Sequence, residues 1–310
     1  MTVLLWTSAD DPPDIWVPAL RAAMPEDEVR VPPDLGDRSE IEYALVWKPE
    51  PGLLASLPNL KVIFSIGAGC DHILADPERP KHLPIVRMLD DNLTAMMTEW
   101  ALLAVLYFHR FMPEYRREQA EAVWNRRWPN WTPETGIGVL GLGAIGRDIA
   151  AKLGLLGFPV HGWSRTLQQV PGIACHHGAE GLKAMLPQCR HLLCVLPLTG
   201  ETRGIIDAGV LSQLPAGAFV INLGRGGHVV DADLLAALDC GHIAGAFLDV
   251  FNDEPPPKGH PYWQHPKVVM TPHVAGEIVP RSAAGTVVAN IRRHQQGEPL
   301  LGVLDLDLGY

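Results

Sequence analysis

The sequence GIGVLGLGAIG at residues 136–146 sets three glycines directly after a short apolar run, with the spacing G-x-G-x-x-G. The run at Ile137–Leu140 predicts a buried strand. Ile145, Ile149, Leu153 and Leu156 then follow in steps of four, four and three, and this spacing predicts a helix. The stretch is therefore typical of a strand that turns sharply into a helix.

The glycines of this turn predict a site for a dinucleotide. Gly141 allows the tight turn, Gly143 lets the backbone approach a pyrophosphate, and Gly146 lets the helix pack closely on the sheet. The helix amino terminus offers N–H groups to phosphate oxygens, so the predicted cofactor residues are Gly141, Gly143, Ala144, Ile145 and Gly146. An ordinary turn is the alternative in a chain with 30 glycines, but the strand–turn–helix context favours the dinucleotide.

Composition restricts the class of protein. A chain of 310 residues predicts two domains, and 47% hydrophobic with 19% charged residues is normal for a globular protein with a large core. The formal net charge of −10 disfavours nucleic acid, whose binding needs clustered basic groups. The five cysteines show neither a C-x-x-C pair nor a zinc spacing, so we expect no metal site and reduced thiols in a cytoplasmic protein.

Neither a signal peptide nor a membrane segment is expected. The amino-terminal residues lack the basic region of a signal peptide and turn acidic at once. The longest apolar run, near residues 100–108, is too short to cross a membrane. We therefore expect no membrane partner.

Strands and helices are expected to alternate, which predicts an α/β protein with two Rossmann-like or flavodoxin-like domains, each a doubly wound parallel sheet. The expected strands are residues 3–6, 44–47, 61–66, 137–140, 159–163, 191–196, 218–223, 243–248 and 268–270. The expected helices are residues 99–109, 179–186, 207–214, 231–238 and 277–296. These elements predict a substrate domain of residues 1–99 and 277–310 and a dinucleotide domain of residues 100–276.

Residues at about 110–135 form a polar, basic and tryptophan-rich arm of the dinucleotide domain. Trp124, Trp128 and Trp131 lie in this arm among Arg116, Arg117, Arg126 and Arg127. Indole rings need burial, so one interpretation is an arm that packs against another subunit, and hence a homodimer. The other is a surface excursion that packs on its own domain.

Three further segments follow expected strands of the second domain, and each carries one side chain suited to chemistry. Arg225 lies in NLGRGG at 222–227, Glu254 in LDVFNDEPPP at 248–257, and His273 in TPHVAG at 271–276. Each alone is compatible with a surface arginine, a solvated carboxylate or a loop histidine. Ligands bind at the carboxyl ends of parallel strands, so the three together beside a dinucleotide turn favour an active site.

These segments resemble the D-isomer-specific 2-hydroxyacid dehydrogenase family, and within it the glyoxylate/hydroxypyruvate reductase branch. The resemblance also includes GLGAIG at 141–146, PLTGETRG at 197–204 and, in the first domain, LPNLKVIFSIGAGCDH at 57–72. It implies an NAD(P)-dependent oxidoreductase that reduces small 2-oxo acids to D-2-hydroxy acids. Glyoxylate would give glycolate, and hydroxypyruvate would give D-glycerate.

The resemblance also implies roles for individual residues. Arg225 would bind the carboxylate and carbonyl of a 2-oxo acid through its planar fork, and His273 would protonate the ketone oxygen as hydride arrives. Glu254 would bond the other imidazole nitrogen, orient the ring and favour its protonated form. Asp249 would lie near the nicotinamide carboxamide.

Further contacts complete the implied site. The backbone N–H groups of Gly67-Ala68-Gly69 would hold the substrate carboxylate, although that loop alone is equally compatible with a plain turn, and Trp47 would wall the pocket. The implied substrate residues are Trp47, Ala68, Gly69, Arg225 and His273. The implied cofactor residues beyond the glycine-rich turn are Ser164, Arg165, Thr166, Leu196, Pro197, Thr202, Leu223, Gly224, Asp249, His273, Ala275 and Gly276.

One position departs from the NAD-using pattern of this fold, in which an acidic residue at the end of the second strand bonds the ribose 2′-OH. Here Ser164 takes that place and Arg165 follows it. A carboxylate would repel a 2′-phosphate, whereas a hydroxyl and a guanidinium suit it. We therefore expect NADPH to be preferred over NADH, the alternative being a solvated arginine on a surface turn.

Two other functions fit the same sequence. The first is a dehydrogenase for another 2-oxo acid or a formate dehydrogenase-like enzyme. Glu254 argues against the formate dehydrogenase branch, because by the resemblance that branch has an amide side chain at this position. The second is a dinucleotide-sensing corepressor or scaffold, because a fold does not fix function. The set of Arg225, Glu254 and His273 favours the enzyme, and NADPH consumption on adding glyoxylate would separate the two classes.

Overall fold

The structure is a computed structural model that describes residues 1–7 and 13–306 of the chain. It contains two compact units, Met1–Leu93 with Ile278–Tyr310 and Thr94–Glu277. The chain passes from the first unit to the second inside helix α3 (Asp91–His109). The sequence predicts this boundary at residue 99, where the helix is expected to begin.

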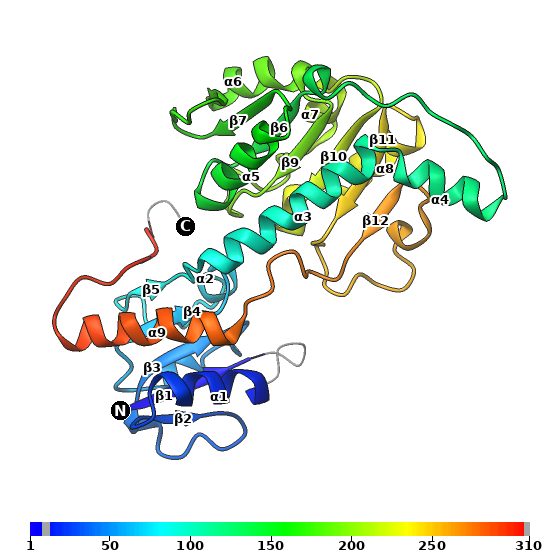
Figure 1. The fold of residues 1–310 in the computed structure, drawn as a ribbon. Coiled ribbons are helices and arrows are strands. Elements are labelled where there is room, and N and C mark those ends of the chain that lie inside the picture. Colours follow the sequence, from blue (N-terminus) through cyan, green and yellow to red (C-terminus); the bar gives the residue numbers. More distant parts are fainter. Residues whose placement is uncertain (8–12, 307–310) are drawn as a thin grey trace. The chain divides into compact units, whose positions relative to one another are not determined.

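A parallel sheet with the strand order β2-β1-β3-β4-β5 forms the centre of the first unit (Figure 1). Its elements are β1 (Thr2–Trp6), α1 (Pro13–Ala23), β2 (Glu28–Arg30), β3 (Ile41–Val46), β4 (Val62–Ser65), α2 (Asp71–Leu74), β5 (Ile85–Val86) and α9 (Pro280–Gln295). Trp16 of α1 and Ile291 of α9 are buried in one apolar cluster with Val3 and Leu5 of the sheet. The strand order is that of a flavodoxin-like sheet.

The second unit has a parallel sheet with the order β12-β11-β10-β9-β6-β7-β8. Its elements after α3 are α4 (Met112–Ala120), β6 (Ile137–Leu140), α5 (Ala144–Leu155), β7 (Val160–Ser164), β8 (Ala174–His177), α6 (Gly178–Met185), β9 (His191–Cys194), α7 (Ala208–Gln213), β10 (Ala218–Asn222), α8 (Asp231–Asp239), β11 (Ile243–Leu248) and β12 (Val268–Met270). The order reverses between the neighbours β6 and β9, and ligands bind at such a point in doubly wound sheets.

The predicted α/β fold with two doubly wound sheets is confirmed. Each expected strand occurs, with its ends displaced by up to three residues. Helix α3 begins at Asp91, eight residues before its predicted start at residue 99. The reason lies at its first turn, where the buried Asp90 carboxylate accepts the backbone N–H of Asn92 at 3.1 Å and so caps the helix.

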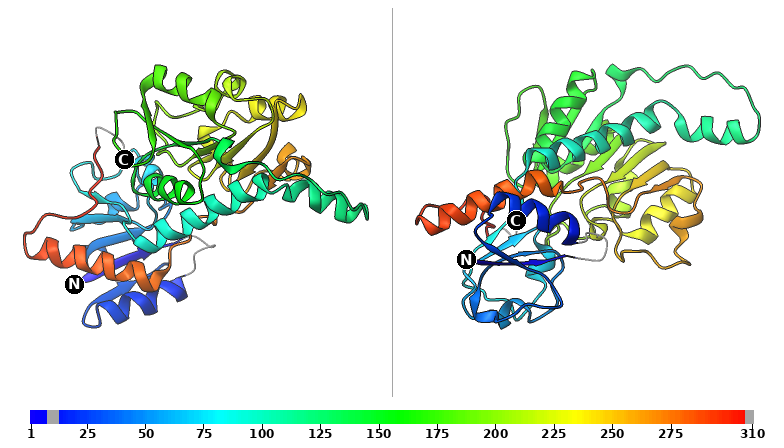
Figure 2. Two further views of the ribbon diagram at one scale, coloured as in Figure 1. Left: turned by 45° about the horizontal axis from the view of Figure 1, so that its top comes forward. Right: turned by 60° about the horizontal axis from the view of Figure 1, so that its bottom comes forward.

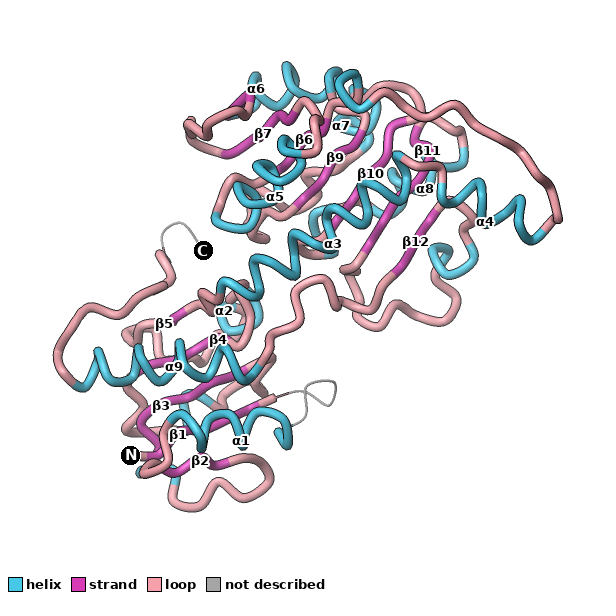
Figure 3. Tube along the Cα trace, in the orientation of Figure 1, coloured by secondary structure: helices cyan, strands magenta, loops and turns pink. Residues whose placement is uncertain are grey.

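The tryptophan-rich arm stands away from the sheet of its own unit (Figure 2). After α4 it continues without helix or strand to residue 131 (Figure 3). Trp124 is fully exposed, and Trp128 and Trp131 are 86% and 66% exposed. The interpretation that these indoles pack on their own domain is therefore wrong, because α4 and the extended segment that follows it project away from the sheet.

A buried carboxylate gives the arm its shape. Glu118 of α4 accepts hydrogen bonds from both Nη atoms of Arg127 at 2.6 Å and from Asn125 at 3.0 Å. These bonds from Arg127, and then from Asn125, lower the pKa of Glu118 to about 2. The bidentate pair fixes the bend after α4, so the exposed indoles are presented by an ordered segment.

Candidate active site

The glycine-rich turn lies between β6 and α5, where the strand order reverses. Gly141 has a φ of 105°, and a Cβ on Gly146 would lie 1.8 Å from the Gly141 carbonyl oxygen. Among the described residues, no heavy atom outside Gly143 and its immediate chain neighbours lies within 4 Å of the place that a Cβ of Gly143 would take. The turn thus leaves an open cradle at the amino terminus of α5, which fits the pyrophosphate of a dinucleotide.

The loop after β7 carries the side chains expected near the ribose phosphate. Ser164 Oγ donates to the Thr166 carbonyl oxygen at 2.8 Å, and Gln168 Nε2 donates to Thr166 Oγ1 at 3.3 Å. Arg165 forms an exposed ion pair with Glu201, with 3.3 Å between Nη1 and Oε2. The loop therefore presents hydroxyls and a guanidinium where an NAD-dependent enzyme of this fold has a carboxylate.

Arg147 joins this loop to the glycine-rich turn, a role that sequence reasoning missed. Its Nε donates to the Leu142 carbonyl oxygen at 2.8 Å, and its Nη2 donates to Gln168 Oε1. A basic residue in the first turn of α5 was the available signal, because cations are disfavoured at the positive end of a helix. The arginine adds a second positive charge beside the loop after β7.

Several predicted cofactor residues are buried within the second unit. These are Leu196, Thr202, Leu223 and Ala275. Thr202 Oγ1 donates to the Pro197 carbonyl oxygen at 2.6 Å and accepts the Thr199 N–H at 2.8 Å. Its hydroxyl thus closes the turn of PLTGETRG, so its part in the site is to shape the segment that begins at Leu196.

In the first unit, Trp47 lies beside the Gly67–Gly69 loop, at the carboxyl ends of β3 and β4. The Trp47 and His72 rings have centroids 4.5 Å apart, and a Cβ on Gly67 would come within 2.7 Å of the indole. Ser65 Oγ donates to the Gly69 carbonyl oxygen at 2.9 Å, and Met88 N–H donates to the Gly67 carbonyl oxygen at 3.2 Å. These bonds fix the loop that is expected to bind a carboxylate, and the indole packs directly against it.

Arg225 lies at the carboxyl end of β10, immediately before the 3-10 turn Gly226–His228. Its Nη1 donates to the Gly224 carbonyl oxygen at 2.8 Å. Its backbone N–H donates to His228 Nδ1 at 3.0 Å, and its carbonyl oxygen accepts from Asn222 Nδ2 at 2.8 Å. The predicted carboxylate-binding arginine is therefore held by its own turn.

Glu254 and His273 come together from the ends of β11 and β12. His273 Nδ1 lies 3.0 Å from Glu254 Oε2, and the two side chains are 29% and 22% exposed. Glu254 Oε1 accepts the backbone N–H of Phe251 at 3.2 Å, which orients the carboxylate. Because Glu254 binds Nδ1, the Nε2 atom of His273 is the one that can exchange a proton with a substrate.

Asp249 is buried and holds the segment that contains His273. Its carboxylate accepts from Thr271 Oγ1 at 2.5 Å and from the backbone N–H groups of Val274 and Ala275 at 3.0 and 2.9 Å. Its carbonyl oxygen accepts the N–H of His273 at 2.8 Å. The resemblance placed Asp249 near the nicotinamide carboxamide; these bonds add the task of positioning the histidine.

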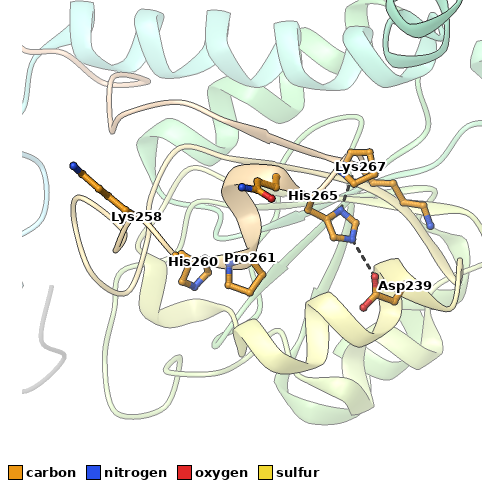
Figure 4. Close-up of a pocket in the computed structure, with 9 residues that line it drawn as sticks. Asp239, Lys258, His260, Pro261, His265 and Lys267 are labelled. Atoms are coloured by element: carbon orange, nitrogen blue, oxygen red, sulfur yellow. Dashed lines mark hydrogen bonds and ion pairs between the residues drawn. The ribbon is translucent and has the colours of Figure 1, made fainter.

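The candidate residues do not line the depression drawn in Figure 4, which has a volume of about 560 Å³ and lies between residues 258–267 and the end of α8. There His265 Nδ1 accepts the N–H of Lys267 at 3.2 Å, and His265 Nε2 lies 3.3 Å from Asp239. His260 Nδ1 likewise accepts a backbone N–H of the same segment at 3.3 Å. Both imidazoles therefore have protein partners within this segment and α8.

Residues 1–7 and 13–306 show neither a candidate metal cluster nor a helix suited to a membrane. They contain no cluster of three or more His, Cys, Asp or Glu side chains able to hold a metal ion. In the same residues, every helix is too short or too polar to span a bilayer.

Comparison with known proteins decides the family. The family profile described as D-isomer specific 2-hydroxyacid dehydrogenase, NAD binding domain, matches residues 102–275. The chain belongs to this family. Glyoxylate/hydroxypyruvate reductase A of Yersinia enterocolitica is 39% identical over 300 residues, which cover 95% of this chain and 96% of that protein. The protein of the same name from Salmonella heidelberg is 42% identical over 301 residues, with the same coverage.

Solved structures of the family match the fold along nearly the whole chain. A D-isomer specific 2-hydroxyacid dehydrogenase from Xanthobacter autotrophicus, solved with NADPH and MES, has a TM-score of 0.94 at 43% identity and covers 99% of both chains. An NADPH-dependent glyoxylate/hydroxypyruvate reductase from Sinorhizobium meliloti, solved with NADP and sulfate, has a TM-score of 0.94 at 37% identity and covers 100% of this chain and 99% of its own. The family predicted from the sequence motifs is confirmed.

Proposed function

We propose that the chain is an NADPH-dependent reductase of small 2-oxo acids, with glyoxylate and hydroxypyruvate as its first substrates and D-2-hydroxy acids as products. The observation that carries this proposal is the Glu254–His273 pair at 3.0 Å, in the unit that also holds Arg225 and the glycine-rich turn. The relatives named glyoxylate/hydroxypyruvate reductase support the choice of substrate.

Each side chain of the site has one task in this reduction. Arg225 binds the carboxylate and carbonyl oxygens of the substrate, which polarises the carbonyl carbon. His273 donates the proton on Nε2 to the carbonyl oxygen, while Glu254 holds Nδ1 and stabilises the charged ring. The nicotinamide supplies the hydride when a dinucleotide is bound at Gly141–Gly146. In the reverse direction, neutral His273 accepts the proton of the alcohol.

The preference for NADPH rests on the loop after β7. Ser164 carries no charge to repel a 2′-phosphate. Arg165 can exchange its exposed partner Glu201 for that phosphate, and Arg147 is bonded to Gln168 in the same loop. Two guanidinium groups therefore favour the phosphorylated dinucleotide. The bound NADPH and NADP of the Xanthobacter and Sinorhizobium structures support this proposal.

The preference for small substrates rests on Trp47. Its indole packs on Gly67 and His72, so it has little freedom to move aside for a bulky group. Lys48 is the neighbouring cation, with its Nζ 5.7 Å from the indole centroid. A single lysine beside an apolar wall is a weak site for a phosphate group, which disfavours phosphorylated 2-oxo acids.

We propose a homodimer that forms through α3, α4 and the arm. The exposed apolar side chains of this region are Leu103, Leu106, Met112, Val123, Trp124, Trp128 and Trp131. A monomeric soluble protein rarely leaves so many large apolar side chains together in water, and closed two-fold dimers are the commonest assembly.

The free, buried thiols of Cys70, Cys189 and Cys194 support a cytoplasmic location.

A panel of substrates tests the proposal. We expect kcat/KM with NADPH to be highest for glyoxylate and hydroxypyruvate and lower for pyruvate, since one methyl group changes discrimination by about 1–3 kcal/mol. Phenylpyruvate and a phosphorylated 2-oxo acid should be the poorest substrates. If either of these is reduced best, the small-pocket argument is wrong and the chain is a dehydrogenase for another 2-oxo acid. Binding of NADPH without turnover of any compound would instead favour the corepressor.

A further inference from the structure

Two fully buried polar side chains enclose the backbone of Arg225. Asn222 Oδ1 accepts the Gly224 N–H at 3.2 Å, and Asn222 Nδ2 donates to the Arg225 carbonyl oxygen at 2.8 Å. On the other side, His228 Nδ1 accepts the Arg225 N–H at 3.0 Å. Both backbone polar groups of Arg225 are therefore bonded to side chains that water does not reach.

The second ring nitrogen of His228 contacts the segment after β9 that is predicted to bind the dinucleotide. His228 Nε2 lies 3.3 Å from the carbonyl oxygen of Pro197. Because Nδ1 accepts from Arg225, Nε2 carries the ring hydrogen and donates it to Pro197. Pro197 follows Leu196 in the segment after β9 that is assigned to the dinucleotide. One neutral imidazole thus connects the turn of the arginine with that segment.

Close packing prevents the imidazole from leaving this position. A Cβ on Gly224 would lie 3.0 Å from Cε1 and Nδ1 of His228 and 3.0 Å from the Leu196 carbonyl oxygen. A Cβ on Gly226 would lie 1.9 Å from the carbonyl carbon of Phe251. The two glycines allow the turn to pack directly on its neighbours, so a displacement of the ring has to move the turn with it.

We propose that His228 is a positioning residue that sets the place of Arg225 relative to the Pro197 segment. This inference rests on the proposed function, in which Arg225 binds the substrate carboxylate. The Nδ1 bond serves substrate binding because it fixes the backbone of Arg225. The Nε2 bond serves cofactor binding because it fixes the carbonyl of Pro197. The two bonds therefore have separable effects on the two ligands.

A pair of substitutions separates the two bonds. His228→Gln retains a donor near the place of Nε2 but loses the acceptor at Nδ1, and His228→Asn retains an acceptor near Nδ1 but loses the donor. We expect His228→Gln to raise the glyoxylate KM and the inhibition constant of oxamate, an unreactive 2-oxo carboxylate, by roughly tenfold, the scale of one hydrogen bond. His228→Asn should instead raise the dissociation constant of NADPH, measured by fluorescence titration.

A second background shows whether His228 acts through Arg225. In an Arg225→Lys chain, His228→Gln should change the oxamate inhibition constant by less than about twofold, because residues that act as a unit are not additive. The same tenfold change in both backgrounds, or equal effects of the Gln and Asn variants on both ligands, would overturn the proposal. Thermal unfolding of each variant shows whether a general loss of stability accounts for its effect.

An NMR measurement on the unaltered chain covers the case in which the variants do not fold. The ¹H–¹⁵N spectrum of the His228 ring should show hydrogen on Nε2 and none on Nδ1 at neutral pH; hydrogen on Nδ1 overturns the proposal. Failure of the unaltered chain to reduce any 2-oxo acid would reject the proposed function instead. If the unaltered chain turns over normally and the two variants change the affinity for neither oxamate nor NADPH, the role of His228 is rejected and the proposed function stands.

Discussion

His273 has a φ of 56°, a left-handed conformation that is uncommon for residues other than glycine. Buried Asp249 maintains this conformation, because its carboxylate bonds the N–H groups of Val274 and Ala275. Backbone strain of this kind persists where the surroundings over-determine it, and such places are often functional. The predicted general acid is thus placed by its loop as well as by Glu254.

The carboxylate of Glu254 should be needed for efficient proton transfer by His273. Glu254→Gln keeps a polar partner for Nδ1 but removes the charge-assisted hydrogen bond that orients the ring. We expect the kcat of glyoxylate reduction to fall by roughly one to two decades, as the loss of a charge-assisted hydrogen bond of about 1.5–3 kcal/mol predicts. Steady-state kinetics at saturating NADPH measure this, with Glu180→Gln as a surface control. A kcat that Glu254→Gln leaves unchanged would show that this carboxylate does not position the histidine.

The cofactor preference should depend on two adjacent residues. Ser164→Asp combined with Arg165→Ala introduces repulsion of the 2′-phosphate and removes its guanidinium partner. We expect the ratio of kcat/KM for NADPH over NADH to fall by roughly one to two decades, while Lys183→Ala, on the exposed side of α6, leaves it unchanged. Equal use of NADPH and NADH by the unaltered chain would show that Ser164 and Arg165 do not set a preference for NADPH.

Individual site residues differed in how far the sequence could predict them. The positions of Arg225, Glu254 and His273 at strand ends were predictable because each lies in a short motif after a strand, and their catalytic roles stay predictions. The contacts of Arg147 and His228 were not, since each includes a bond to a residue far away in the sequence, Gln168 for Arg147 and Pro197 for His228. The same applies to Asp249, whose bonds to residues 271–275 appear only once β11 and β12 are paired.

Among the secondary-structure elements, strands that are buried on both faces were the easiest to predict from the sequence. Strands β6, β9 and β10 are short, largely apolar runs that are buried throughout, so they were predictable. Strand β8, with the sequence ACHH, was missed because it is a half-exposed edge strand without an apolar pattern. Strands β2 and β5 have three and two residues, which is too short for a periodic signal.

A buried aromatic stack connects α3 with the sheet of its unit. Phe108 of α3 stacks on Phe219 of β10 with centroids 4.5 Å apart, and His191 of β9 stacks on Phe219 at 5.1 Å. His191 Nδ1 is buried without a hydrogen-bond partner among the described residues. Burial, followed by the nearby His109 and Arg190, lowers the pKa of His191 to about 3.

This histidine should make the fold sensitive to acid. In the unfolded chain His191 binds a proton near pH 6.5, whereas in the folded chain it does not. The contribution of this residue to the free energy of unfolding is therefore fully present above pH 6.5 and is lost as the pH falls toward 3. Between pH 7 and 5, the free energy of unfolding should fall by about 2 kcal/mol less in His191→Phe than in the unaltered chain. Urea unfolding at both pH values measures it, with the exposed His82→Ala as control. An identical pH dependence in His191→Phe and the unaltered chain would contradict this assignment.

For the whole molecule, the two-unit organisation was predictable from the length of the chain and its repeated strand–helix alternation. The position of the first boundary was not, because α3 continues through it without a glycine or proline to mark it. The arm was recognised from its composition, but the exposure of its indoles could only be found in the structure, since sequence does not show which surface an indole faces.

The exposed arm predicts an assembly of two chains. Light scattering at micromolar concentration should give twice the chain mass of 33.8 kDa. Trp124→Ser combined with Trp128→Ser should shift the protein toward the monomer, because it removes apolar area that the partner would cover. Trp263→Ser changes a half-exposed indole outside the arm and should leave the dimer intact. A monomeric unaltered chain under these conditions would refute the proposed interface.

The central claim is that His273 transfers a proton while NADPH reduces a small 2-oxo acid. The most direct test is the loss of NADPH absorbance on adding hydroxypyruvate, compared between the unaltered chain and His273→Ala, with the chirality of the glycerate determined. We predict D-glycerate as product and a kcat that falls by roughly 10²–10⁴ in the variant. L-glycerate as product, or a variant as active as the unaltered chain, would contradict the claim.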